Sequence, residues 1–298
     1  MIAFHIGFPK SASTFIKRRY LSGSALSTVI PRGGMLRDIR TLEGVALLDS
    51  LQASGVNLNE NTVFSNEMLV GDSFWSVTGS ERVPRNIASA FPEAKILMVL
   101  REQVSYIHSA YRFSVMNGSV LPALDRFMED IAEDIERKLS YHMLVEEYLR
   151  HFPSEQVLVL PFEMLKMNPA RFENTVERFL ELPEGQARNA LPERRNSTAE
   201  IDWKAVMTLR KCNRVLRYTY ALESRLKKPR HNSLRKLGEH PNAHRALVRL
   251  IARIHVGSRA ASEYPATSEV GLLFAKSNAR TSDLIGLNLE EYGYTVPE

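Results

Sequence analysis

Short apolar runs alternate with amphipathic segments along the first 180 residues of the chain. The apolar runs, which we expect to be strands, cover residues 2–7, 25–30, 62–68, 95–100 and 156–160. Between them apolar residues recur at helical spacing, which predicts helices over residues 14–21, 35–53, 84–91, 103–116, 125–150 and 170–182. This alternation predicts an α/β fold, a P-loop-like parallel sheet flanked by helices.

The pattern becomes almost wholly helical from residue 202 onward. It predicts helices over residues 203–226, 244–256 and 267–279, so the C-terminal third of the fold is expected to be largely helical. We therefore expect a single domain over residues 1–298, with an α/β core at 1–200 and a helical part at 201–298.

Composition narrows the class of protein. The hydrophobic fraction of 44% is ordinary for a globular chain. A single cysteine, Cys212, excludes a disulfide framework and a cysteine metal cluster, and no His, Cys and Asp residues show metal-ligand spacing. No apolar run reaches membrane-spanning length, and the chain begins with an expected strand, so we expect a cytoplasmic protein. Because metal-ligand spacing is missing, we also expect no bound metal.

The positive charge is concentrated in one stretch. Residues 201–260 hold fifteen Lys and Arg against three Asp and Glu, a net of +12, whereas the whole chain carries +5. This asymmetry indicates an anionic partner near the C-terminal third, although solvated helix faces would give the same composition.

A polar turn, Phe8–Ser13, separates the first strand from the first helix. Backbone N–H groups of such a turn and the positive end of the helix dipole converge on one point, where phosphate is the usual ligand. Lys10 adds a positive charge there, and Ser11, Ser13 and Thr14 add hydroxyl donors. The turn is therefore a candidate anion site, with an ordinary strand-to-helix turn as the alternative.

This turn is not a nucleotide-triphosphate loop of the form G-x-x-x-x-G-K-S/T. Counting from Gly7, the second glycine would fall on Ala12 and the lysine on Ser13. The lysine instead comes three residues after the glycine, so the sequence argues against a P-loop kinase.

A second pair of polar residues, Arg101 and Ser109, follows the apolar run at 95–100. Arg101 leaves the strand at its carboxyl end, and Ser109 lies eight residues later on the next expected helix. Arginine supplies a planar fork of donors and serine completes the oxygen shell of an anion, so the pair is a candidate for a second phosphate.

These segments resemble the PAPS-dependent sulfotransferase family, and in particular a bacterial branch similar to carbohydrate sulfotransferases. The turn at 9–14 resembles the family's 5′-phosphosulfate loop, Pro-Lys-S/T-G/A-S/T-S/T, and Arg101 with Ser109 resembles its 3′-phosphate pair. The strand and helix at 157–180 and the tail at 277–294 are also similar. Glu102-Gln103 departs from the Asp-Pro of many members, and Phe162 replaces the usual Tyr.

The resemblance implies a reaction and its residues. It implies transfer of a sulfuryl group from 3′-phosphoadenosine 5′-phosphosulfate (PAPS) to a hydroxyl acceptor on a carbohydrate or glycolipid, with 3′,5′-adenosine bisphosphate (PAP) as product. The residues expected to hold the donor are Lys10, Ser11, Ala12, Ser13, Thr14, Phe15, Arg101 and Ser109. Lys10 is also expected to neutralise the leaving phosphate, and Glu67, which follows a strand, is the expected general base.

Other readings stay open from the sequence. His108 and His142 are rival bases, whereas His5 is expected to be a core histidine and Glu163 to hold local structure. The rival functions are a small-molecule kinase and an inactive sulfotransferase-fold module that binds an anionic polymer. We expect no nucleic acid, and peripheral membrane contact is a further alternative for the basic stretch.

Overall fold

The computed structural model describes residues 1–20, 26–58, 61–71, 74–119, 121–185, 203–226, 248, 250–251 and 268–298, with the backbone alone for 216–226. The chain divides into two compact units. The first comprises residues 1–106, 131–193 and 268–298, and the second comprises 107–130 and 194–267.

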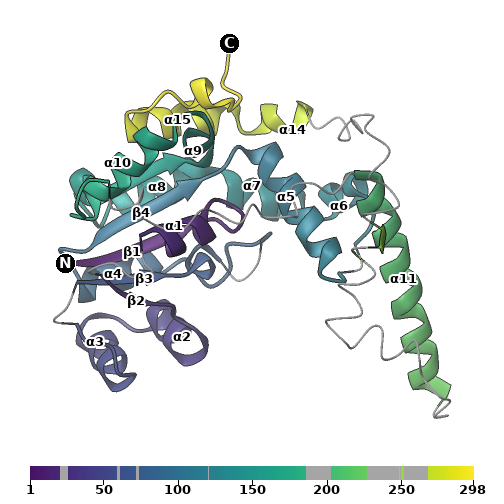
Figure 1. The fold of residues 1–298 in the computed structure, drawn as a ribbon, viewed down its shortest axis with the longest axis horizontal. Coiled ribbons are helices and arrows are strands. Elements are labelled where there is room, and N and C mark those ends of the chain that lie inside the picture. Colours follow the sequence, from purple (N-terminus) through teal and green to yellow (C-terminus); the bar gives the residue numbers. More distant parts are fainter. Residues whose placement is uncertain are drawn as a thin grey trace. The chain divides into compact units, whose positions relative to one another are not determined.

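The first unit contains a five-stranded sheet in the order β2-β3-β1-β4-β5, in which every pairing is parallel (Figure 1). Its strands are β1 (Ile2–Gly7), β2 (Ser27–Val29), β3 (Thr62–Ser65), β4 (Lys95–Leu100) and β5 (Val157–Pro161). The predicted parallel sheet is confirmed, and each expected strand is present with ends that differ by a few residues at most.

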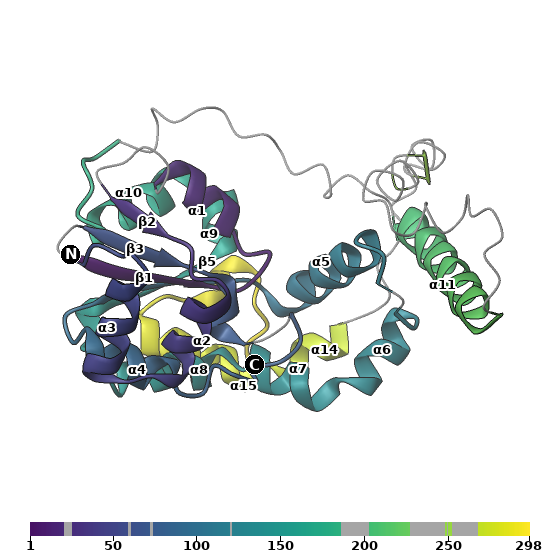
Figure 2. The same cartoon turned by 90° about the horizontal axis from the view of Figure 1, so that it is seen from below.

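Helices cover both faces of this sheet. Figure 2 shows α1, α9 and α10 on one side of the strands, and α3, α4, α8 and α15 on the other. These helices are α1 (Ser13–Arg19), α3 (Gly44–Ala53), α4 (Val83–Ala90), α8 (Tyr141–Leu149), α9 (Phe162–Met167), α10 (Pro169–Phe179) and α15 (Ala275–Ile285). Because both faces are covered, the strands are apolar along their length, as β4 already indicated in the sequence.

The remaining helical elements complete the two units. They are α2 (Gly33–Thr41), η1 (Glu67–Val70), α5 (Gln103–Met116), α6 (Leu124–Asp130), α7 (Ala132–Leu139), η2 (Ser154–Gln156), α11 (Trp203–Leu226), α14 (Ser268–Leu273) and η5 (Leu289–Tyr292). The predicted limits of α5 and α11 are confirmed.

Three predicted helices were wrong in their limits. The helix expected over 35–53 is two helices, because Leu42 and Glu43 are extended and Gly44 starts α3 with a φ of 51° that glycine adopts at low cost. The helix expected over 125–150 is broken into α6, α7 and α8, with non-helical backbone at Ile131 and Ser140. The helix expected over 267–279 is divided at Phe274, the N-cap of α15.

The expected helix over 244–256 lies almost wholly outside the described residues. The described C-terminal part consists of α11, α14, α15 and η5, all helical, and α15 packs against α8 in the first unit. His142 Nδ1 lies 2.8 Å from Ser277 Oγ, and Arg280 pairs with Glu146 at 2.9 Å. The C-terminal tail is therefore part of the layer that covers the sheet.

The second unit has a small core of its own. Trp203, at the start of α11, lies beside His108 and Tyr111, with ring centroids 5.9 and 5.7 Å apart. Asn213 Nδ2 donates to the carbonyl of Val115 at 2.7 Å. These contacts join α5 to α11 across about a hundred residues of sequence.

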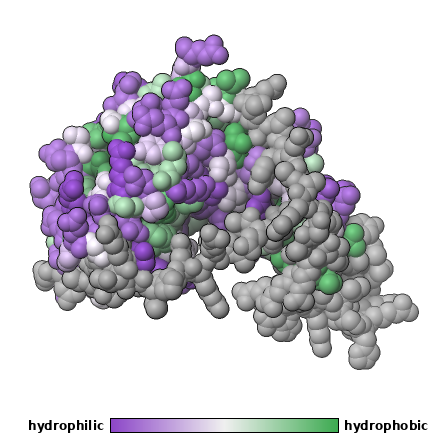
Figure 3. All heavy atoms as spheres, turned by 45° about the horizontal axis from the view of Figure 1, so that its top comes forward, coloured by the Kyte–Doolittle hydropathy of each residue, from purple (hydrophilic) through white to green (hydrophobic). Residues whose placement is uncertain are grey.

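The described surface is mostly hydrophilic on the face shown in Figure 3, with small apolar spots between polar side chains. Within the described residues no helix is long and apolar enough to span a bilayer. The same residues contain no cluster of three or more His, Cys, Asp or Glu that could hold a metal ion.

A buried amide pair ties the C-terminal tail to the start of α5. Gln103 Nε2 donates to Asn278 Oδ1 at 2.6 Å, and Asn278 Nδ2 donates back to Gln103 Oε1 at 3.2 Å. Asn278 also donates to the carbonyl of Thr295 at 2.9 Å, so one side chain holds two distant segments. Gln103 thus has a structural reason to stand where the related pattern has proline.

We predict that Asn278→Leu lowers the free energy of unfolding by about 2 kcal/mol, because the buried Gln103 amide loses its partner. Urea denaturation measures this loss. The double variant Gln103→Leu/Asn278→Leu should lose less stability than the two single variants lose in sum, by about 1 kcal/mol. Strictly additive losses would show that the two amides do not act as a pair.

Candidate active site

The register of three strands brings the candidate residues to one edge of the sheet. β1 lies between β3 and β4, with His5 opposite Ser65 and Gly7 opposite Val99. Glu67 comes two residues after Ser65, and Arg101 comes two residues after Val99. The loop after β1 is therefore flanked by Glu67 on one side and Arg101 on the other, at the carboxyl ends of the strands where ligands bind in such sheets.

The loop after β1 has an unusual backbone. Lys10 and Ala12 both have left-handed conformations, with φ of 67° and 61°. Each such non-glycine residue costs about 1–2 kcal/mol, and such costs gather at functional sites. The Phe8 amide donates to the Val99 carbonyl at 3.4 Å, and the Ser11 amide donates to the Phe8 carbonyl at 3.2 Å. These bonds fold the loop tightly against the end of β4.

Two hydroxyls inside this loop are buried without a partner. Ser11 is 0% exposed and Ser13 is 5% exposed, and neither Oγ has a hydrogen-bond partner among the described residues. Buried polar atoms are nearly always paired, so two unpaired hydroxyls in one loop are candidates to bind the oxygen atoms of an anion. Ala12 has no side chain that could cap α1, which leaves the first amides of that helix without a side-chain acceptor.

The other two predicted loop residues differ in their positions. Thr14 is exposed, whereas the Phe15 ring packs against Tyr20 and Phe172 in the core. Only the backbone N–H of Phe15 can therefore serve a ligand, and its side chain holds α1 against α10.

Arg101 is built into the loop. Its Nη1 donates to the Lys10 carbonyl at 2.7 Å, and its Nε and Nη2 donate to Ser105 Oγ at 2.9 and 2.8 Å. Its own carbonyl accepts from Tyr141 Oη at 2.5 Å. Three of its five N–H groups are used in this way, so two remain for an anion. Burial lowers the pKa of the guanidinium, and the nearby Glu163 carboxylate opposes that shift.

Phe162 lies beneath this cation. The Arg101 Cζ is 5.0 Å from the centroid of its ring, and Lys166 Nζ is 4.5 Å from the same centroid. The replacement of the usual tyrosine by Phe162 thus retains the ring that supports Arg101.

Glu163 holds local structure, as expected. Its Oε2 accepts from the Glu102 amide at 3.4 Å and from Tyr294 Oη at 3.1 Å. Burial raises the pKa of the Glu163 carboxyl. Glu102 in turn caps α5, since its carboxylate accepts from the amides of Val104 and Ser105 at 2.8 and 2.7 Å. The departure from Asp-Pro therefore preserves a helix cap.

Ser109 is half-buried on α5, in the residues assigned to the second unit. Ser105 and Ser109 are four residues apart on one helix and so share a face. Arg101 donates to Ser105 Oγ, a residue that the sequence did not single out. The pairing of Arg101 with Ser109 on one phosphate stays a prediction.

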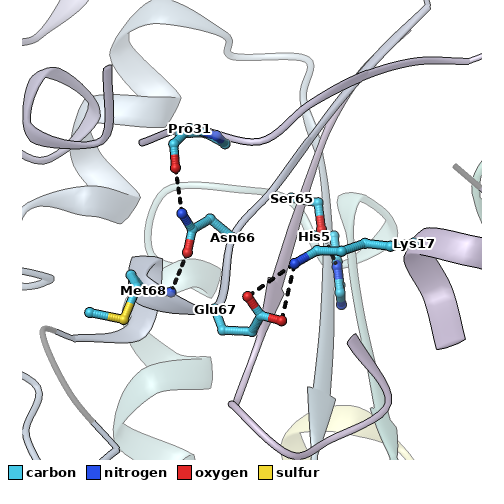
Figure 4. A network of polar contacts seen from close by, with 7 residues as sticks. All are labelled: His5, Lys17, Pro31, Ser65, Asn66, Glu67 and Met68. Atoms are coloured by element: carbon cyan, nitrogen blue, oxygen red, sulfur yellow. Dashed lines mark hydrogen bonds and ion pairs between the residues drawn. The ribbon is translucent and has the colours of Figure 1, made fainter. Parts of the chain in front are cut away.

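Glu67 forms an ion pair with Lys17 of α1. Lys17 Nζ lies 3.1 Å from Oε1 and 3.0 Å from Oε2, and Figure 4 shows the ammonium between the two carboxylate oxygens. Burial alone would raise the pKa of the Glu67 carboxyl. Its backbone N–H hydrogen bond and the Lys17 ammonium outweigh that effect and hold the pKa below its ordinary value. Glu67 is therefore ionised at neutral pH.

The backbone beneath Glu67 is anchored by its neighbours. Asn66 accepts from the Met68 amide at 2.7 Å and donates to the Pro31 carbonyl at 2.5 Å (Figure 4). Ser65 Oγ lies 2.8 Å from His5 Nδ1 across the strands. The end of β3 is thus fixed from two directions.

The rival bases have contacts of their own. His142 Nδ1 lies beside Ser277 Oγ, and the His108 ring lies tilted beside the ring of Trp203. The sequence reasoning did not single out one buried lysine: Lys138 is buried and donates to the carbonyls of Val70 and Ser76, at 3.0 and 2.7 Å. No periodic pattern distinguishes it from the other charged residues of α7.

Comparison with known proteins identifies a family for part of the chain. Residues 82–223, just under half of the chain, match the family described as the sulfotransferase domain. The match includes Arg101, Ser109 and Glu163, whereas the loop at Lys10 and Glu67 lie before it.

Relatives and a solved structure agree with this family. The chain is 30% identical over 114 residues to bifunctional heparan sulfate N-deacetylase/N-sulfotransferase 1 of Xenopus tropicalis. The aligned region covers 34% of this chain and 13% of that protein. It is 26% identical over 114 residues to the corresponding enzyme 2 of Homo sapiens, with the same coverage. The chain thus spans a small part of the length of these curated relatives.

A crystal structure of a sulfotransferase from Alicyclobacillus acidocaldarius has a TM-score of 0.56, with 16% identity and coverage of 98% of both chains. This likeness shows that the sulfotransferase fold extends over nearly the whole chain. The bacterial carbohydrate branch within the family stays a prediction.

His5 gives the stability of the first unit a testable pH dependence. Burial lowers the pKa of the imidazole to about 4, from an ordinary value of 6.5, while Glu67 opposes and Lys17 adds to that shift. Between these two values the unfolded chain binds the proton more tightly, so acidification from pH 6.5 toward 4 destabilises the folded state. The effect is about 1.4 kcal/mol per pH unit within that window and is absent above it.

We predict that His5→Gln, which replaces the imidazole near Ser65 by an amide that does not titrate, removes this contribution. Urea denaturation at pH values between 4 and 7 measures it as a shallower loss of stability with acid than in the wild type. His151→Gln, just beyond the C-terminal end of α8 where the half-buried imidazole lies beside Glu147, is the matched control and should keep the wild-type slope. Equal slopes for His5→Gln and the wild type would contradict the assignment to His5.

Proposed function

We propose that the chain transfers the sulfuryl group of PAPS to a hydroxyl acceptor on a carbohydrate or glycolipid. The observation that carries this proposal is the pair of buried, unpartnered hydroxyls of Ser11 and Ser13 inside the left-handed loop. A phosphosulfate supplies the oxygen acceptors that those hydroxyls and the neighbouring amides lack.

Two cations support an anionic guest at this place. Lys10 belongs to the loop itself, and Arg101 donates to the Lys10 carbonyl while retaining N–H groups for a second anion. A donor with phosphates at both the 5′ and the 3′ position meets both cations. We therefore assign the 5′-phosphosulfate to residues 10–15 and the 3′-phosphate to Arg101 with Ser109.

The proposed reaction is a direct in-line displacement. The acceptor oxygen attacks sulfur, the bond between sulfur and the bridging phosphate oxygen breaks, and Glu67 takes the acceptor proton. Lys10 neutralises the charge that grows on the departing phosphate of PAP. In this proposal the loop positions the donor, and the acceptor approaches Glu67 from the side of β3.

The curated relatives support a carbohydrate acceptor. Their names state that they are heparan sulfate N-sulfotransferases, enzymes of a polyanionic glycan. The basic stretch over residues 201–260 has a positive net charge, which would attract such a glycan. Heparan sulfate and its N-desulfated form are therefore the first acceptors to test, since together they offer hydroxyl and amino groups.

The first test of the donor is thermal melting with PAP, AMP and ATP–Mg²⁺. We predict that PAP raises the melting temperature, because a ligand that binds only the folded state stabilises it by about 2.7 kcal/mol at a hundredfold excess over its dissociation constant. AMP, which lacks the 3′-phosphate, should give a smaller shift, and Arg101→Met should abolish the difference between PAP and AMP. A shift with ATP–Mg²⁺ alone would support a kinase instead.

The transfer step is tested by substitution of the loop lysine. We predict that Lys10→Ala lowers transfer of labelled sulfate from PAPS to heparan sulfate by about a hundredfold or more, because the leaving phosphate loses its cation. Lys276→Ala, on the exposed side of α15, is the control and should transfer normally. Near-normal transfer by Lys10→Ala would remove the loop from the mechanism.

A further inference from the structure

Lys17 lies where the phosphosulfate loop and the expected base meet, and neither the family pattern nor the sequence reasoning gave it a role. It stands four residues after Ser13 on α1, so the two side chains share one face of that helix. Its ammonium contacts both oxygens of Glu67, at 3.1 and 3.0 Å. One side chain thus connects the helix that follows the loop with the residue that follows β3.

We propose that Lys17 is a positioning residue that holds the Glu67 carboxylate ionised and aimed at the loop before the acceptor arrives. This inference rests on the proposed function of Glu67 as the general base. It adds a residue that touches the base instead of the donor.

The anchoring of Glu67 explains why its side chain needs such a partner. Its backbone is fixed by Asn66, which bonds the Met68 amide and the Pro31 carbonyl, and by the Ser65 contact with His5. None of these bonds reaches the carboxylate. The two contacts from Lys17 restrict the remaining side-chain rotations, and they do so from the helix that carries Ser13 (Figure 4).

The charges around Glu67 come from three elements. Lys17 approaches from α1, His5 from β1, and Arg40 from α2, where its guanidinium donates to the Met68 carbonyl. His5 is neutral near pH 7, because burial lowers its pKa to about 4. Arg40 donates to a backbone carbonyl, whereas Lys17 contacts the carboxylate itself.

The ion pair has a chemical consequence for the transfer step. Glu67 and Lys17 are 28% and 23% exposed, so the pair is partly shielded from water and holds the carboxylate in its charged form. When the acceptor proton moves to Glu67, the carboxyl becomes neutral and the ion pair ends. The pair therefore belongs to the state before transfer, in which an ionised base is required.

The test compares Lys17→Gln, which removes the charge, with Lys17→Arg, which keeps it. Both are assayed for transfer from PAPS to heparan sulfate across pH, and for PAP binding by calorimetry. In Lys17→Gln we expect the acidic limb of the kcat profile to move to higher pH, with about tenfold or greater loss at its acidic end. Lys17→Arg should restore the wild-type limb. Arg18→Gln, the exposed neighbour on α1, is the matched control and should leave the profile in place.

A second readout does not depend on activity. Carboxyl carbon NMR of the full chain, with the Glu67 signal assigned through Glu67→Gln, follows the ionisation of Glu67 directly. We expect the Glu67 pKa to be higher in Lys17→Gln than in the wild type. An unchanged Glu67 titration would overturn the proposal.

PAP binding separates the remaining outcomes. We expect the dissociation constant for PAP to change by less than about threefold in Lys17→Gln, since the contact is with the base. A large loss of PAP affinity with an unmoved acidic limb would make Lys17 a donor ligand and overturn its positioning role. If the wild type neither binds PAP nor transfers sulfate, the proposed function fails, and the NMR titration still decides whether Lys17 controls Glu67.

Discussion

The site depends on the position of β1 in the middle of a parallel sheet. Parallel strands end at the same edge, and the order β3-β1-β4 places the ends of two other strands on either side of the loop that follows β1. Glu67 and Arg101 each come two residues after a strand residue that is paired with β1. A shift of either register by one residue would turn the strand's side chains to the opposite face and move these groups away from the loop.

The loop itself is held in a conformation that its residues would not adopt alone. Two left-handed non-glycine residues cost about 2–4 kcal/mol together, and the Phe8 and Ser11 amides and the Arg101 guanidinium provide the bonds that hold them. The same arrangement leaves two hydroxyls buried and unpaired. The loop is thus ordered before any ligand binds, so that donor binding would not have to supply the free energy of ordering it.

Several departures from the family pattern become understandable from their contacts. Glu102 caps α5, Gln103 exchanges hydrogen bonds with Asn278, and Phe162 supports Arg101 with its ring. Each replacement retains a physical role or adds one in the first unit. The C-terminal tail is therefore joined to the active-site edge through the start of α5, although about 170 residues separate the two segments in the sequence.

Much of the site follows from local pattern. Apolar runs and helical spacing predicted the parallel sheet and α5, and the polar turn at Lys10 together with Arg101 at a strand end gave a candidate anion site. The breaks within 35–53 and 125–150 did not follow, because a helical pattern continues across residues whose backbone is turned by packing.

Pairing between distant side chains came only from the tertiary structure. Lys17 with Glu67, Arg101 with Ser105 and the Lys10 carbonyl, and Gln103 with Asn278 depend on how strands and helices pack. The sequence around each residue does not indicate its partner, since any charged residue on a helix has the same local pattern. The sequence by itself determined which strand ends carry the candidate residues, because apolar runs and the polar residues after them are local features. The packing of α1, α5 and α15 decided which side chains meet, because contacts across tens of residues are formed by the fold as a whole.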